Sequence, residues 1–149
     1  MNRLKLFWHF YKAKQNTTMS SSSIKAMQDK KLRNLLKHAY NHSEFYRKSF
    51  HNAGITAENL HSLPLSAFPT IDKKILLENF DSVVTSNDVC QKDLIRFDEL
   101  QKEKSGLYKD KYHIVHSSGS TGKPGYFVYD EKAWDTMLIG IIRAALWNG

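Results

Sequence analysis

Residues 112–134 read YHIVHSSGSTGKPGYFVYDEKAW, and this stretch carries the clearest pattern in the chain. β-Branched and aromatic residues dominate positions 112–116, which predicts a strand. Serines and glycines follow, and residues 125–129 predict a second strand. Asp130 is suited to cap a helix over residues 131–147, where apolar positions recur at helical spacing. The order strand, loop, strand, helix indicates an α/β fold class.

The loop between the two predicted strands has the composition of an anion-binding turn. Its two glycines allow backbone conformations that expose successive N–H groups. Its hydroxyl groups are short donors, and the lysine ammonium can reach a phosphate oxygen. We therefore expect the loop to bind a polyphosphate through Ser117, Ser118, Gly119, Ser120, Thr121, Gly122 and Lys123.

Other interpretations of this loop fit less well. A Walker A loop has four residues between its glycines and Ser or Thr after its lysine. Here two residues separate Gly119 from Gly122, and Pro124 follows Lys123. The Gly-x-Ser-x-Gly elbow is absent, so Ser118 is not expected to be a hydrolase nucleophile. A flexible linker uses the same residue types, but the two flanking strands favour a binding loop.

The sequence upstream of residue 86 is predicted to be mainly helical. Apolar residues follow helical spacing over residues 24–40, and Ser43 can cap a second helix. Gly54 stands where a glycine often ends a helix. Asp72 can cap a short helix over residues 73–80, which follows two prolines that exclude a continuous helix. The apolar residues 83–85 suggest a short strand.

The chain divides by composition into four segments. Residues 1–23 form a basic, serine-rich leader, and residues 24–85 the helical region. Residues 86–111 are a charged loop region with some helix, and residues 112–149 hold the strands, the loop and the last helix. A length of 149 residues suits a single domain.

Positive charge is concentrated near the N-terminus. The whole chain has a net charge of +7, whereas residues 1–48 carry eleven Lys and Arg against Asp29 and Glu44. No nucleic-acid-reading module accompanies these residues, so a solvated or docking surface is favoured and no nucleic acid is expected. Salt-sensitive binding of nucleic acid or an acidic membrane through residues 1–48 is kept as an alternative.

The remaining sequence features favour a cytoplasmic protein without a metal site of its own. Cys90 is the only cysteine, which excludes an internal disulfide. No transmembrane segment or signal peptide is expected. His38 and His42 have zinc-compatible spacing but lack the glutamate of the protease motif, and His113 and His116 would point to opposite faces of a strand.

Three stretches of the chain resemble a known enzyme family. SSGSTGKP at 117–124 resembles the phosphate loop of the adenylate-forming superfamily, which includes acyl-CoA synthetases. LLKHAYNHSEFYRKSFHNAGI at 35–55 and LPLSAFPTIDKKILLENF at 63–80 resemble phenylacetate-CoA ligase-like and CapK-like proteins. The resemblance runs from about residue 32 to residue 134.

The resemblance implies an ATP-dependent carboxylate ligase. Such an enzyme forms an acyl-adenylate and pyrophosphate and then commonly transfers the acyl group to coenzyme A, so ATP, Mg²⁺, coenzyme A and a carboxylic acid are the implied cofactors and partners. The resemblance places residues 118–123 against the β- and γ-phosphates of ATP and assigns no catalytic residue here. Only 26 residues follow Lys123. We therefore expect an incomplete N-terminal part of the family's large domain, inactive alone; a non-catalytic remnant is the alternative.

Overall fold

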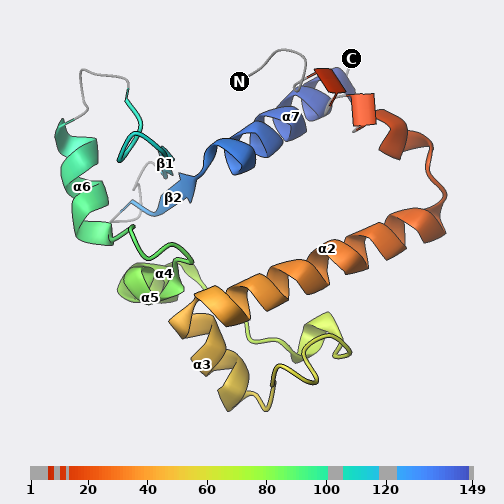
Figure 1. The fold of residues 1–149 in the computed structure, drawn as a ribbon, viewed down its shortest axis with the longest axis horizontal. Coiled ribbons are helices and arrows are strands. Elements are labelled where there is room, and N and C mark those ends of the chain that lie inside the picture. The colour runs from red at the N-terminus through yellow and green to blue at the C-terminus, as the bar shows by residue number, and fades with distance from the viewer. Residues whose placement is uncertain (1–6, 9–10, 13, 101–105, 118–123, 148–149) are drawn as a thin grey trace.

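The structure is a computed structural model that describes residues 7–8, 11–12, 14–100, 106–117 and 124–147. Figure 1 shows mainly helices, with one small sheet near the C-terminal helix. In chain order the elements are η1 (Asn16–Thr18), α2 (Ser21–His42), α3 (Glu44–Asn52), η2 (Leu65–Ala67), α4 (Lys73–Glu78), α5 (Phe80–Val83), α6 (Gln91–Leu100), β1 (His113–His116), β2 (Tyr126–Tyr129) and α7 (Glu131–Trp147).

The predicted helix boundaries near residue 43 are confirmed. The Ser43 N–H donates to Ala39 O at 2.9 Å and ends α2, and the Ser43 Oγ accepts from the Tyr46 N–H at 3.2 Å and starts α3. Gly54 has φ +72° just beyond α3, which is the left-handed conformation typical of a helix-ending glycine. Short polar side chains thus set the sharp turn between α2 and α3.

The helical region has its own hydrophobic core. Side chains from α2 and α3 pack on the irregular segment that follows them, and the buried members are Leu36, Phe50, Ile55, Leu60 and Phe68. Arg33 joins the same two parts, because its Nη1 donates to Leu63 O at 2.7 Å. The largely irregular segment after α3 is therefore fixed by hydrophobic packing and by guanidinium hydrogen bonds to Leu60 O and Leu63 O.

The strand predicted over residues 83–85 is wrong. Phe80–Val83 is the helix α5, and the Val84 N–H donates to Phe80 O at 3.0 Å as a helical turn does. Phe80 is buried and Val84 packs against the same cluster. Two residues that are four positions apart lie on the same face of a helix, so this packing favours a helical turn. The helix predicted over residues 73–80 ends at Glu78, where the Asn79 Nδ2 donates to Ile75 O and competes with the helical ladder.

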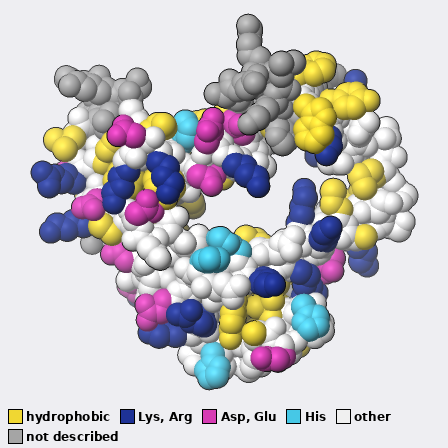
Figure 2. All heavy atoms as spheres, viewed as in Figure 1, with side chains coloured by type: hydrophobic (Ala, Val, Ile, Leu, Met, Phe, Trp, Pro, Cys, Tyr) yellow, Lys and Arg dark blue, Asp and Glu magenta, His cyan; other side chains and the backbone are white. Residues whose placement is uncertain are grey.

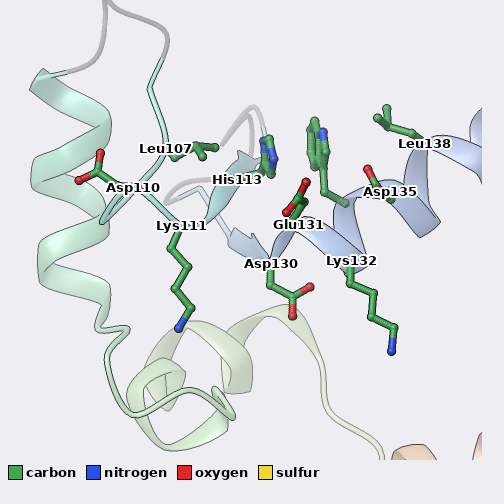
Figure 3. A pocket seen from close by; sticks show the side chains of 10 residues that line it. Leu107, Asp110, Lys111, His113, Asp130, Glu131, Lys132, Asp135 and Leu138 are labelled. Atoms are coloured by element: carbon green, nitrogen blue, oxygen red, sulfur yellow. The ribbon is translucent and has the colours of Figure 1, made fainter. Parts of the chain in front are cut away.

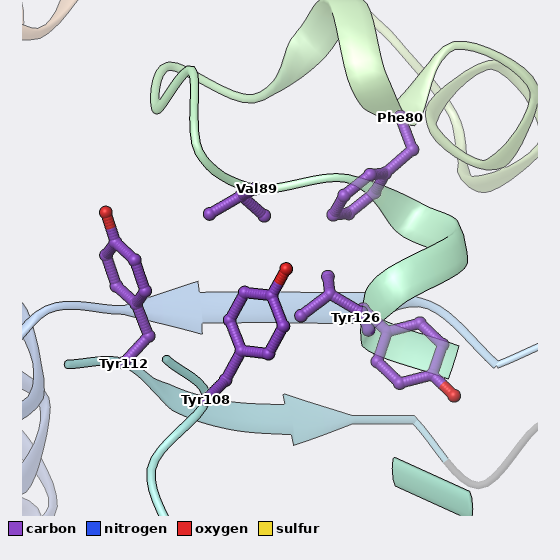
Figure 4. Packing of buried hydrophobic residues seen from close by; sticks show 6 residues of the cluster. Phe80, Val89, Tyr108, Tyr112 and Tyr126 are labelled. Atoms are coloured by element: carbon purple, nitrogen blue, oxygen red, sulfur yellow. The ribbon is translucent and has the colours of Figure 1, made fainter. Parts of the chain in front are cut away.

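The two predicted strands form an antiparallel hairpin. The register pairs His113 with Tyr129 and His116 with Tyr126. β1 begins one residue later than predicted, because Tyr112 instead pairs with Tyr108 in a bridge ahead of it. β2 also begins one residue later than predicted, at Tyr126, since the Gly125 N–H donates to the Ser117 Oγ. One face of the hairpin covers a second core with α5 and α6 (Figure 4), whose buried members are Phe80, Val89, Leu94, Tyr108, Tyr112 and Tyr126.

The helix α7 begins where the sequence predicts. The Asp130 Oδ1 accepts from the Ala133 N–H at 2.7 Å, and the Trp134 ring stacks on His113 with centroids 4.3 Å apart. Beyond this contact α7 leads away from the hairpin (Figure 1), and Ile141 is 58% exposed. The space-filling view is hollowed at its centre (Figure 2). No helix within the described ranges is both long and apolar enough to cross a membrane.

Candidate functional site

The candidate site lies at the end of the hairpin where the chain leaves β1 and returns to β2. The Ser117 N–H donates to Gly125 O at 3.0 Å, and the Gly125 N–H donates to the Ser117 Oγ at 2.9 Å. We call this pair the loop neck. Of the seven predicted site residues, only Ser117 is described; Ser118, Gly119, Ser120, Thr121, Gly122 and Lys123 lie outside the described residues.

Next to the loop neck, the last strand pair converges on a carboxylate of α6. The Tyr126 hydroxyl donates to the Asp98 Oδ2 at 3.1 Å, and the His116 Nε2 lies 3.6 Å from the Asp98 Oδ1. Burial raises the pKa of Tyr126 to about 12, and the Asp98 carboxylate adds to this rise. The hydroxyl therefore stays protonated at neutral pH and serves as a donor to Asp98.

An open cleft of about 810 Å³ lies beside the returning strand. Pro124 and Tyr126 line it on the hairpin side, and Lys73 and Lys74 at the start of α4 line it opposite. Glu78 and Glu99 also line this cleft, so positive and negative side chains are equally represented. Because Pro124 directly follows Lys123, this cleft adjoins the end of the predicted phosphate loop.

A second cleft of about 720 Å³ lies at the opposite end of the hairpin. Its lining side chains come from the segment before β1, from His113 of β1, from Asp130 and from the first turns of α7 (Figure 3). The carboxylates of Asp110, Asp130, Glu131 and Asp135 outnumber Lys111 and Lys132 there. This charge distribution disfavours a polyphosphate, so the cleft beside the loop neck is the better candidate.

The histidines weighed as metal ligands have other contacts. The His38 and His42 rings lie 4.5 Å apart on α2, while His113 stacks on Trp134 and His116 lies beside Asp98. Within the described part of the chain, no group of three His, Cys, Asp or Glu side chains is arranged to hold a metal ion. No described residue is therefore assigned as a ligand for Mg²⁺.

Sequence reasoning did not identify Asp98, Lys73 or Lys74 as neighbours of the loop. Asp98 lies 18 positions before His116 in a segment predicted as a charged loop region with some helix, and the two lysines lie at the start of the helix predicted over residues 73–80. Their placement depends on how α4 and α6 pack against the hairpin. A short-range pattern carries no signal for such contacts.

No family model matches the chain. The chain is 30% identical to the phenylacetate-coenzyme A ligase of Aromatoleum evansii over 131 residues, which is 85% of this chain and 25% of that protein. It is also 30% identical to the phenylacetate-coenzyme A ligase of Escherichia coli (strain K12) over 132 residues, 86% of this chain and 26% of that protein. The phenylacetate-coenzyme A ligase of Pseudomonas putida matches with the same identity and coverage.

The chain thus spans about a quarter of the length of the curated relatives it matches. The matches extend over 85–86% of this chain. They support a relationship with the phenylacetate-coenzyme A ligases.

Proposed function

We propose that the chain belongs to the adenylate-forming ligase family and provides the polyphosphate-binding part of an ATP-dependent acid–CoA ligase. In the reaction, a carboxylate attacks the α-phosphorus of ATP, which gives an acyl-adenylate and pyrophosphate. The thiol of coenzyme A then attacks the acyl carbon and displaces AMP. The similarity to three phenylacetate-coenzyme A ligases supports this proposal.

The observation that carries the proposal is the closed loop neck. Hydrogen bonds of 2.9 and 3.0 Å between Ser117 and Gly125 bring the two ends of the SSGSTGKP segment together. In the sequence, the hydroxyl groups, the two glycines and Lys123 lie between these joined ends, and an anion-binding turn needs such groups within a short stretch of chain. A flexible linker between separate parts would not have its two ends joined in this way.

In this proposal the loop acts on the leaving group. Negative charge accumulates on the β- and γ-phosphates as the bond to the α-phosphorus breaks, and N–H, hydroxyl and ammonium donors stabilise that charge. Lys73 and Lys74 line the adjoining cleft, but Glu78 and Glu99 line it as well, so the cleft itself carries no excess of positive charge and the proposal rests on the donors of the loop. The acid, Mg²⁺ and coenzyme A are assigned no described residue.

The test is ATP–pyrophosphate exchange by the full-length protein, with phenylacetate as the first acid. Lys123→Ala removes one charge-assisted contact, and we expect exchange to fall about 10–100-fold because neighbouring N–H groups share the charge. Gly119→Val should reduce exchange further, since a β-branched residue resists the backbone conformations of such a loop. The thioester-forming step from preformed acyl-adenylate should change far less.

Lys132→Ala is the matched control, because Lys132 is exposed and lines the cleft at the other end of the hairpin. Its exchange rate should equal that of the wild type. Unchanged exchange in both loop variants would show that residues 117–123 only connect the strands. A wild-type protein that binds ATP without any exchange across a panel of acids would instead favour a non-catalytic relative of these ligases.

A further inference from the structure

We propose that Asp98 is a positioning residue that holds both ends of the polyphosphate loop from outside the hairpin. Asp98 belongs to α6, and no residue of α6 is part of the loop. The effect on nucleotide binding rests on the proposed function, whereas the effect on the loop neck does not.

The geometry assigns one oxygen of Asp98 to each strand. The Oδ2 accepts from the Tyr126 hydroxyl at 3.1 Å, and the Oδ1 lies 3.6 Å from the His116 Nε2. His116 and Tyr126 are partners in the register, and they are the last pair of the two strands before the loop neck. A single carboxylate therefore binds β2 through the Tyr126 hydroxyl and lies beside His116 of β1, at the end of the hairpin that carries the loop.

The hairpin needs such an external support. A two-stranded ribbon has little stability alone in water, and its end beyond the last strand pair is held by the Ser117 and Gly125 hydrogen bonds. The helix α6 is anchored in the second core, where Leu94 is fully buried in a cluster that includes Phe80 and Val89 as well as the tyrosines of the hairpin segment. Asp98 lies four residues after Leu94, so both face the same side of α6. The carboxylate thus fixes the position of the loop neck relative to α6.

The same core offers a matched control. Asp88 accepts from the Tyr112 hydroxyl at 2.8 Å and pairs with Lys111 at 3.4 Å. Like Asp98, it joins a buried tyrosine to a partly exposed carboxylate, but it holds the turn before β1 and lies at the other end of the hairpin. Variants at Asp88 and Tyr112 therefore remove an equivalent hydrogen bond without touching the loop neck.

The first measurement is hydrogen–deuterium exchange in the full-length protein, which requires no ligand. A hydrogen bond of ordinary net strength changes an opening equilibrium about fivefold. We expect Asp98→Asn and Tyr126→Phe to speed exchange about fivefold in peptides that cover the loop neck. Exchange there should equal that of the wild type in Asp88→Asn and Tyr112→Phe. Exchange that rises equally in both pairs, or in neither, would overturn the proposal.

The second measurement is the KM for pyrophosphate in the exchange assay. A displaced loop should raise this KM about fivefold in Asp98→Asn and leave the KM for the acid unchanged, and Asp98→Glu should restore part of it. A loosened neck with an unchanged KM for pyrophosphate would show that Asp98 does not position the loop for binding. If the wild type shows no exchange activity, the proposed function fails, and hydrogen exchange alone still decides whether Asp98 holds the loop neck.

Discussion

Ser117 and Gly125 close the hairpin through one backbone and one side-chain hydrogen bond. The Gly125 N–H donates to the Ser117 Oγ at 2.9 Å, where a regular ladder would use a backbone carbonyl as the acceptor. The Ser117 N–H donates to Gly125 O at 3.0 Å. A serine hydroxyl therefore marks the point at which strand pairing ends and the loop begins.

Ser117→Ala should loosen this point without unfolding the protein. The substitution leaves the Gly125 N–H without its acceptor, which we expect to cost about 0.5–1.5 kcal/mol in the free energy of unfolding. The KM for pyrophosphate should rise as well. Urea denaturation and the exchange assay check the two effects. Gly125→Ala is the comparison: it keeps both hydrogen bonds, and its added Cβ would lie 3.7 Å from the Ser117 Oγ, at ordinary contact distance, so it should not lower the free energy of unfolding as Ser117→Ala does.

Ser43→Ala should be more damaging than a comparable change at the start of α2. Ser43 is fully buried, and its Oγ both accepts from the Tyr46 N–H at 3.2 Å and donates to Ser82 O at 2.9 Å. Losing a helix cap and a link to α5 should cost about 2–3 kcal/mol. Ser20 also caps a helix, through the Ser23 N–H at 3.2 Å, but is exposed, so Ser20→Ala should cost about 0.5–1 kcal/mol. Equal losses in urea denaturation would contradict this difference.

Two glycines with open space around them should respond oppositely to alanine. Neither Gly54 nor Gly140 has an atom within 4 Å of an added Cβ, so backbone conformation decides the outcome. Gly54 has φ +72°, and Gly54→Ala should destabilise the protein by about 1 kcal/mol. Gly140 lies inside α7, and Gly140→Ala should stabilise it by about 0.5–1 kcal/mol. Thermal unfolding of both variants shows directly whether each substitution raises or lowers the stability of the protein.

Local sequence signals predicted the boundaries of many elements correctly. Ser43, Asp72 and Asp130 each accept the hydrogen bond expected of a helix cap, at 3.2, 2.8 and 2.7 Å. Caps act over three residues, so a single sequence contains all that is needed to find them. The composition of the hairpin strands was equally informative, since neighbours in sequence became partners in the sheet.

Features that depend on distant parts of the chain were missed. Residues 83–85 have the composition of a strand, but Phe80 and Val84 pack on one cluster and favour a helical turn. Asp98 accepts a hydrogen bond from Tyr126, which lies 28 positions further along the sequence, and no periodic pattern in the sequence indicates this contact. The polyphosphate loop thus stays a prediction from composition, while the lysines of the neighbouring cleft and the Asp98 carboxylate are found only from the packing of α4 and α6.

The Tyr126 hydroxyl should make the free energy of unfolding depend on pH in the alkaline range. Burial and the contact with Asp98 raise the pKa of its hydroxyl to about 12 in the folded chain, compared with about 10 in the unfolded chain. Between these values the unfolded chain loses the proton while the folded chain keeps it. The stabilisation is therefore complete below pH 10 and is lost as the pH rises through 12.

Comparison of the wild type with Tyr126→Phe isolates this effect. Burial also raises the pKa of Tyr46 and Tyr108, but their contributions are common to both proteins and cancel. Between about pH 9 and 11, the wild type should lose about 1 kcal/mol more in its free energy of unfolding than Tyr126→Phe, because phenylalanine has no proton to retain. Urea denaturation at the two pH values measures the difference. Parallel losses in the two proteins would mean that the Tyr126 hydroxyl ionises as readily when folded as when unfolded, and that its hydrogen bond to Asp98 does not hold β2 against α6.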